Sequence, residues 1–240
     1  MDAWATGAAF VPYCGPGATP ADLLGRWNGD PLLLTALAVA AILLWRAKAR
    51  WAAWAALGLA ALLFVSPLCA LSSALFSVRT VHHVLLAAVL APLAAWSLPP
   101  ARRGGLALAT LAAAGVFWSW HAPAAYAFAL SHDGAYWLMQ GSLFVTALAF
   151  WMAVRAARPL PAIAALLVST VQMGLLGAVL TLAGRALYAP HFATTLAWGQ
   201  TPLADQQAAG LIMWAPAAAI YLAVALRRMS RQLQPDGMPA

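Results

Sequence analysis

The chain has 240 residues, of which 64% are hydrophobic and only 8% are charged. A soluble domain of this length needs far more polar surface to cover its core, so the composition excludes that class. Apolar runs of about 20 residues recur along the whole length, which predicts an all-α, polytopic membrane protein. The runs are continuous and rich in Ala and Leu, which argues against a β-barrel. The net charge of +7 then belongs to loops at the membrane surface rather than to a nucleic-acid site.

Seven apolar segments predict seven transmembrane helices, the first of them short for a bilayer. We expect an outer N-terminal tail over residues 1–30, a seven-helix transmembrane domain over 31–226 and a cytoplasmic C-terminal tail over 227–240. The predicted spans, in chain order, are residues 31–46, 51–71, 77–98, 105–127, 135–154, 160–183 and 205–226.

Basic residues alternate between the two sides of this arrangement. Ten of the thirteen Lys and Arg residues follow the odd-numbered spans, and three lie on the opposite side. This bias predicts an outside N-terminus and a cytoplasmic C-terminus. The ten are Arg46, Lys48, Arg50, Arg102, Arg103, Arg155, Arg158, Arg227, Arg228 and Arg231; the three are Arg26, Arg79 and Arg185.

All five histidines fall on the outer side or just inside it, together with most acidic residues. An ionisable group at membrane depth is a functional candidate, and imidazole and sulfur ligands suit copper. We therefore expect a copper site, occupied transiently, in the outer leaflet. Its candidate ligands are His82, His83, His121, His191 and Asp205, with Cys14 and Cys69 as further candidates; His132 lies in a short outer loop.

Several of these residues have competing interpretations. His82 and His83 are adjacent on a helix and point about 100° apart, so they cannot simply chelate one ion together. Asp205 can serve as an acid at a helix N-terminus, or it can pair with Arg79 or Arg185; we favour the ion pair. Cys14 and Cys69 can form a disulfide, bind copper or, for Cys69, pack as a small apolar residue.

Small residues in the last two spans predict a close helix–helix contact. They are Gly174, Gly177 and Ala178 in the sixth span, and Ala208, Ala209 and Gly210 in the seventh. Gln172, in the middle of the sixth span, is expected to hydrogen-bond to another helix.

Four groups of residues resemble the CtaG family of cytochrome c oxidase assembly factors, which are seven-span bacterial membrane proteins. The most specific is Asp-Gln-Gln at 205–207 followed by Gly-Leu-Ile-Met-Trp at 210–214. The resemblance covers nearly the whole chain and rests on residues 13–16 with 27–31, 77–86, 120–126 with 136–140, and 187–191 with 198–214.

The resemblance implies a non-enzymatic role in building the haem–copper oxidase, through copper supply to its catalytic subunit. The implied partners are the oxidase subunits and periplasmic copper chaperones. His83, His121 and Asp205 match the family pattern directly. Arg79 and Gln140 stand where many members have a histidine, so an identical ligand set is not expected here.

Two other functions are compatible with an outer-leaflet histidine cluster. A permease for copper or a small solute needs polar groups across the whole bilayer, whereas the inner halves of these spans are apolar. A membrane metallohydrolase needs a general base, and the sequence contains no Glu. We therefore favour the assembly factor.

Overall fold

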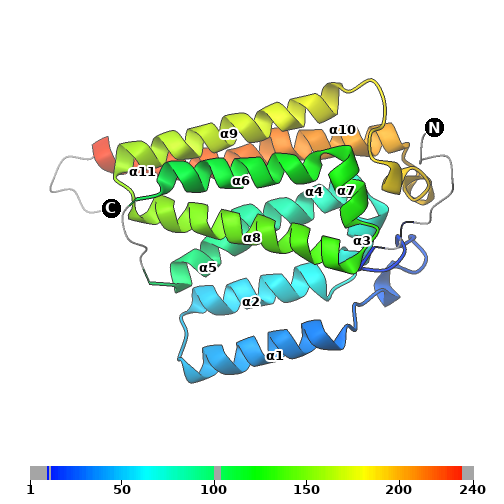
Figure 1. The fold of residues 1–240 in the computed structure, drawn as a ribbon, viewed down its shortest axis with the longest axis horizontal. Helices are drawn as coiled ribbons and strands as arrows, with labels where there is room; N and C mark the ends of the chain where they lie inside the picture. The colour runs from blue at the N-terminus through cyan, green and yellow to red at the C-terminus, as the bar shows by residue number, and fades with distance from the viewer. Residues whose placement is uncertain (1–9, 11, 100–103, 234–240) are drawn as a thin grey trace.

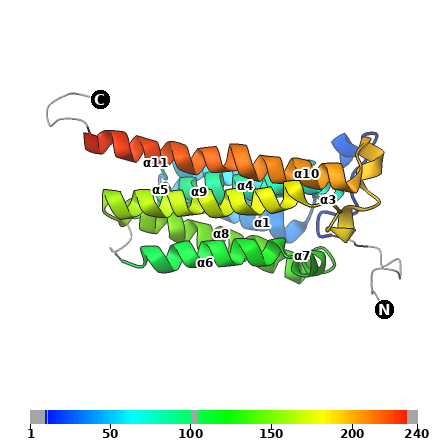
Figure 2. The same ribbon diagram turned by 90° about the horizontal axis from the view of Figure 1, so that it is seen from above.

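The computed structural model describes residues 10, 12–99 and 104–233, which form an elongated bundle of helices lying side by side (Figures 1 and 2). Within these ranges no β-strand occurs, in agreement with the predicted all-α class. Arg102, Arg103 and residues 234–240 of the predicted C-terminal tail lie outside the described residues.

Every predicted span is occupied by helix. In chain order the helices are α1 (Pro31–Arg46), α2 (Trp51–Phe64), α3 (Leu68–Ala74), α4 (Phe76–Leu85), a π-helical segment η3 (Leu86–Leu90), α5 (Ala91–Ser97), α6 (Leu106–His121), α7 (Pro123–Ala129), α8 (Asp133–Ala156), α9 (Pro159–Leu182), α10 (Pro202–Ile212), a π-helical segment η6 (Met213–Ala217) and α11 (Ala218–Leu233). Short 3₁₀ turns η2 (Leu23–Gly25), η4 (Ala189–His191) and η5 (Thr195–Trp198) lie in the connecting segments.

Four continuous helical stretches of the described chain are long and apolar enough to cross a membrane: Phe76–Ser97, α8, α9 and Pro202–Leu233. The bent pair α2 and α3 makes a fifth if it is counted as one span. The helices α1 and α6 are apolar but have only 16 residues each. The last stretch continues to Leu233, beyond the predicted end at residue 226.

Two predicted spans are interrupted by proline. The segment 51–71 bends by 47° between α2 and α3, where Pro67 lacks the N–H that would continue the helix. The segment 105–127 breaks after His121, because Ala122 precedes Pro123 and takes an extended conformation with ψ 128°. The prediction of continuous helices was wrong at both places, and both breaks lie at the same end of the bundle (Figure 1).

The two ends of the bundle differ in chemistry. The cysteine end carries Cys14 and Cys69, together with α3 and α7, at the right of Figure 1. The arginine end carries Arg50, Arg155 and Arg227, near the N-terminus of α2 and the C-termini of α5, α8 and α11. We use these two names below.

An N-terminal strap, residues 12–30, crosses the cysteine end. The Asn28 N–H donates to the Val65 carbonyl (2.8 Å), and the Trp198 indole donates to the Ala18 carbonyl (2.8 Å). Gly17 lies against α3 so closely that a Cβ there would come within 2.9 Å of the Ala74 Cα, so only glycine fits. The strap is thus seated on the bundle by backbone and side-chain contacts.

The predicted close contact of the last two spans is confirmed. A Cβ added to Gly177 on α9 would lie 2.7 Å from the Gly210 carbonyl oxygen on α10. Gln172 accepts a hydrogen bond from the Trp118 indole of α6 (2.8 Å), as expected for an interhelical amide. These contacts join α9 to α6 and to α10, the helix that carries Asp205.

Candidate functional site

Two of the predicted ligands meet in the core near the cysteine end. His83 lies on α4 and His121 is the last residue of α6, and their ring centroids are 5.8 Å apart. Both are almost fully buried, with 2% and 4% of their surfaces exposed. Gln140 of α8 lies beside them, with its amide nitrogen 3.4 Å from His83 Nε2. Three separate helices therefore supply this cluster.

The hydrogen bonds of His121 determine which ring nitrogen carries its lone pair. Its Nδ1 lies 2.7 Å from the Phe117 carbonyl oxygen, which can only accept, so Nδ1 carries the proton. Its Nε2 is then the nitrogen with a lone pair. A donated bond to a backbone carbonyl is the usual support of a metal-binding histidine, and it orients the ring for ligation through the other nitrogen.

His82 and His83 point toward different helices, as their spacing predicts. His82 Nε2 donates to the Leu63 carbonyl of α2 (3.1 Å), and its ring packs edge-on against Phe64 at 5.1 Å. The Nδ1 atoms of both histidines are buried and have no hydrogen-bond partner among the described residues. His83 therefore belongs to the cluster with His121, and His82 lies at its margin.

His191 is fully engaged in holding loops together. Its Nδ1 donates to the Ala74 carbonyl (3.2 Å), and its Nε2 accepts from the Tyr126 hydroxyl (2.7 Å). Burial lowers the pKa of His191 to about 3, so the ring is neutral at pH 7. Neither nitrogen is available to a metal while both bonds persist, so this arrangement is at odds with its prediction as a ligand.

Asp205 caps a helix other than its own. It is fully buried, and its carboxylate accepts hydrogen bonds from the Phe76 N–H (2.6 Å) and the Ser77 N–H (3.1 Å) at the start of α4. The Ser77 hydroxyl also donates to it. An anion is stabilised there by the unpaired N–H groups and the helix dipole.

The favoured pairing of Asp205 with an arginine was wrong. The single ion pair among the described residues joins Arg26 to Asp22 at 2.9 Å. Asp205 is satisfied instead by the backbone of α4, which also occupies both carboxylate oxygens and so disfavours the predicted metal role.

Arg79 is fully buried on α4, one turn before His83. Its Nε donates to the Ser72 carbonyl (3.2 Å) and its Nη1 to the Tyr136 hydroxyl (3.4 Å), with the guanidinium 5.3 Å from the centroid of the Tyr136 ring. Its Nη2 has no partner among the described residues. The arginine thus joins α3 to α8 and places a positive charge near the histidines.

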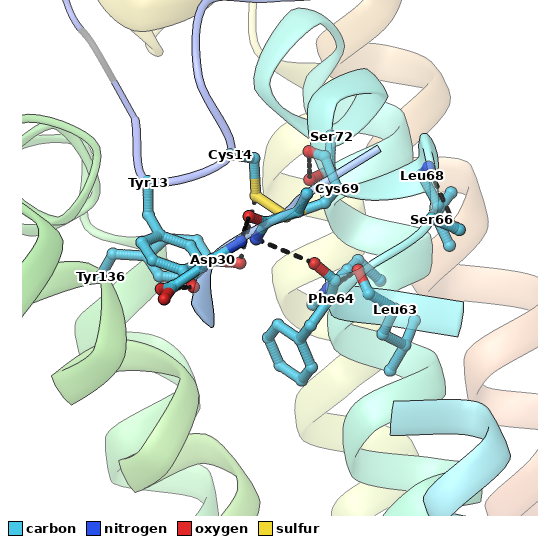
Figure 3. The surroundings of a disulfide bond; sticks show 12 residues. Tyr13, Cys14, Asp30, Leu63, Phe64, Ser66, Leu68, Cys69, Ser72 and Tyr136 are labelled. Atoms are coloured by element: carbon cyan, nitrogen blue, oxygen red, sulfur yellow. Dashed lines mark hydrogen bonds between the residues drawn. A yellow bond between two sulfur atoms is a disulfide. The ribbon is translucent and has the colours of Figure 1, made fainter. Parts of the chain in front are cut away.

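A disulfide joins Cys14 to Cys69, with 5.4 Å between the Cα atoms (Figure 3). This outcome selects one of the three interpretations, and it excludes both cysteines as thiolate ligands in this form of the protein. Next to the bond, the Tyr136 hydroxyl lies 3.5 Å from Cys14 Sγ, and the Tyr13 ring stacks on Tyr136 at 5.1 Å. The disulfide therefore fastens the strap to α3, next to Tyr136 of α8, the helix that carries Gln140.

Tyr13 also joins the strap to the start of α1. Its hydroxyl donates to Asp30, which caps α1 by accepting from the Leu32 N–H at 2.8 Å. The bond from Tyr13 is the main cause of the lowered pKa of Asp30. The strap is thus linked to α1, α3 and α8.

Buried tyrosines are the part of the site that sequence reasoning missed. Tyr126 donates to His191, and Tyr188 donates to the backbone carbonyl of His121 (2.7 Å). Tyr136 receives the bond from Arg79. These tyrosines lie in the same short stretches of sequence as the histidines. Because a buried tyrosine needs a partner for its hydroxyl, this proximity could have indicated that they hydrogen-bond near the histidines.

The predicted ligand set is dispersed rather than gathered. No group of three or more His, Cys, Asp or Glu side chains that could hold a metal ion occurs within the described ranges. The structure brings together His83 and His121, with His82 nearby, and uses His191, Asp205, Cys14 and Cys69 in structural bonds. What remains is a buried pair of imidazoles beside an amide and a guanidinium.

Comparison with known proteins agrees with the resemblance stated above. Residues 106–234, more than half of the chain, match the family model of the cytochrome c oxidase caa3 assembly factor, Caa3_CtaG. The matched region includes His121, Gln140, His191 and Asp205, and begins after His83. No curated protein and no solved structure matches the chain. On the family match, the chain belongs to the Caa3_CtaG family of cytochrome c oxidase assembly factors.

Proposed function

We propose that this protein supports copper insertion into a haem–copper cytochrome c oxidase, with His83 and His121 as transient ligands for the ion. The observation that carries the proposal is the meeting of two buried imidazoles, 5.8 Å apart, in a member of an oxidase assembly family. Copper is cargo in this account. The oxidase subunits are the receiving partners, periplasmic copper chaperones are the donors, and the protein itself catalyses no reaction.

The chemistry around the pair is compatible with a copper ion. Imidazole is a good ligand for copper, and the His121 ring already has the supported Nδ1–H that leaves Nε2 for ligation. Binding at His83 requires its unpartnered Nδ1 to carry the lone pair, or the Gln140 amide to move away from Nε2. Both changes are local rotations or proton shifts.

Arg79 limits how tightly a cation can bind. Its charge lies one helical turn from His83, and Asp205 makes no ion pair with it. Like charges repel strongly in a buried site. A donor must release its ion, so a site of few ligands beside a positive charge is consistent with transfer rather than storage.

The same proposal places the protein in the bacterial inner membrane with seven spans, the N-terminus outside and the C-terminus in the cytoplasm. The disulfide supports an oxidising, outer location for the cysteine end. The gathering of Arg50, Arg155 and Arg227 at the opposite end supports a cytoplasmic location there. In this account α1 and α6 are the two short spans.

The orientation is testable with single added cysteines. We expect Ser131→Cys, in the loop before α8, to react in intact spheroplasts with a maleimide that cannot cross membranes. Ser230→Cys, near the end of α11, should react only after the membrane is opened. The reverse pattern would contradict the orientation.

Copper binding is testable with purified protein and a competing Cu(I) chelator. We expect His83→Ala and His121→Ala each to weaken Cu(I) binding by about tenfold or more, because each removes one of two ligands. His132→Ala is the matched control, since the His132 side chain is exposed and hydrogen-bonds only to Ser131 in the described chain. His121→Met should retain binding through its thioether. Equal affinity in all four variants would overturn the proposed ligands.

A further inference from the structure

A large groove at the arginine end is lined by basic side chains from three elements of the bundle. It has a volume of about 620 Å³ and lies between the N-terminus of α2, the end of α5, the end of α8 and the end of α11. Its five arginines are Arg50, Arg155, Arg227, Arg228 and Arg231. The groove is of the size that holds a small-molecule ligand or a lipid headgroup.

The arginines of this groove have no carboxylate partner in the described chain. The four acidic residues described, Asp22, Asp30, Asp133 and Asp205, lie in or next to the strap, at the start of α8 or beside the start of α4, all toward the cysteine end. The only ion pair within the described ranges involves Arg26 of the strap. Five clustered positive charges without a carboxylate partner among the described residues favour an anionic ligand.

One of the five arginines is held in place by the backbone. Arg155 is half-buried, and its Nη1 donates to the carbonyls of Ala95 and Leu98, the latter at 3.4 Å. These carbonyls lie at the C-terminal end of α5. Arg228 is also half-buried, whereas Arg50, Arg227 and Arg231 are exposed. The groove therefore combines a guanidinium that is fixed by backbone carbonyls with more exposed ones at its rim.

The rest of the groove is apolar and aromatic. Trp51 and Trp96 line it and are 72% and 46% exposed, as expected for side chains at a membrane interface. Trp96 lies 6.4 Å from Trp151, which stacks on Tyr221 of α11 at 5.3 Å. The arginines of this groove suit the phosphate of a phospholipid, and its apolar, tryptophan-lined wall suits the acyl chains.

We propose that this groove binds the phosphate headgroup of an anionic phospholipid, with a preference for a lipid that carries two phosphodiesters. Guanidinium groups bind phosphate oxygens through paired N–H donors, and basic pockets between helices on the cytoplasmic side are suited to such headgroups. Two phosphates match several arginines better than one does, and the acyl chains lie along the apolar wall. This site is separate from the histidine pair, so it can exist whether or not the protein binds copper.

Native mass spectrometry of the protein in detergent tests the proposal. We expect diphosphatidylglycerol to stay bound more tightly than phosphatidylglycerol, and phosphatidylethanolamine not to be retained. The triple variant Arg227→Gln/Arg228→Gln/Arg231→Gln should lose about a hundredfold in affinity for diphosphatidylglycerol, given the usual contribution of each basic residue near anionic lipid.

A second triple variant controls for net charge. Arg46→Gln/Lys48→Gln/Arg158→Gln removes the same three charges from the arginine end without touching the groove, and we expect a loss of less than about threefold. If the first variant unfolds, Arg50→Gln/Arg231→Gln changes only exposed arginines and should still lose affinity. Equal losses in groove and control variants, or no preference over phosphatidylethanolamine, would overturn the site.

A competition experiment distinguishes a lipid site from a site for free phosphate. Inorganic phosphate or pyrophosphate at millimolar concentration should not displace the lipid, because neither uses the apolar wall. Displacement would show that the groove takes a soluble phosphate and would contradict a lipid site.

Discussion

The two ends of the bundle differ in how their polar side chains are partnered. At the cysteine end, polar side chains are paired within the protein: Asp205 caps α4, His191 bridges two segments, and a disulfide fastens the strap. At the arginine end, five arginines line an open groove with no carboxylate near them in the described chain. The first end is held together by internal bonds around His83 and His121, whereas the second is the end where we propose that an anionic phospholipid binds.

The largest expected difference between the two ends comes from removing the disulfide. The double variant Cys14→Ser/Cys69→Ser opens a loop of 55 residues, which corresponds to about 4 kcal/mol of chain entropy in the unfolded state. We expect a clear fall in thermal stability and rapid proteolysis within the strap. Cleavage in the loop between α1 and α2, at the arginine end, should not change. Equal acceleration at both ends would contradict a local role for the bond.

Substitution of Asp205 should have the next largest effect. Asp205→Ala leaves two buried N–H groups of α4 without an acceptor, at about 3 kcal/mol or more in total. Asp133→Ala is the matched control, because Asp133 is also a first-turn acid but is exposed, and we expect less than about 1 kcal/mol. Arg231→Ala, at the other end, should also change little. Thermal unfolding in detergent measures all three, and similar losses would remove the contrast.

Acid should weaken the cysteine end through His191. Its folded-state pKa of about 3 is below the ordinary value of 6.5, so the unfolded chain takes up the proton first as the pH falls. The stability contributed by neutral His191 is complete above about pH 6.5 and is lost progressively toward pH 3. Between pH 7 and 5 the loss should reach about 2 kcal/mol.

The variant His191→Asn separates the pH-dependent stability that His191 contributes from that of the other titratable groups. His191→Asn should lose less stability than the wild type over the same pH range, while His132→Asn should behave like the wild type. Identical pH dependence in all three proteins would show that His191 does not titrate in this way.

Much of the fold follows from the sequence, and most of the site does not. Apolar runs of about 20 residues correctly indicate where helix occurs, because a membrane-spanning helix must be apolar along its length, and four or five of the predicted spans are long and apolar enough to cross a membrane. The breaks at Pro67 and Pro123 were missed, although proline and the residue before it favour them. The spacing of His82 and His83 correctly indicates that they face different helices.

The partners of the polar residues depend on contacts between distant parts of the chain. Asp205 is 129 residues from Phe76, and no local pattern shows that a carboxylate on α10 will cap α4. His191 likewise finds Tyr126 and Ala74 only when three segments pack together. Sequence reasoning therefore gathered the histidines, cysteines and Asp205 toward one end of the molecule, but it assigned to a metal several groups that make structural hydrogen bonds or a disulfide.

The most direct test of the account is the copper content of the oxidase made in cells with altered histidines. The chromosomal gene is replaced by His83→Ala/His121→Ala or by the control His132→Ala, membrane levels of each protein are matched, and the purified oxidase is analysed for copper and haem. The account predicts an oxidase depleted of copper but containing haem in the double variant, with normal copper in the control. Full copper occupancy in the double variant would contradict a role of the His83 and His121 pair in copper insertion.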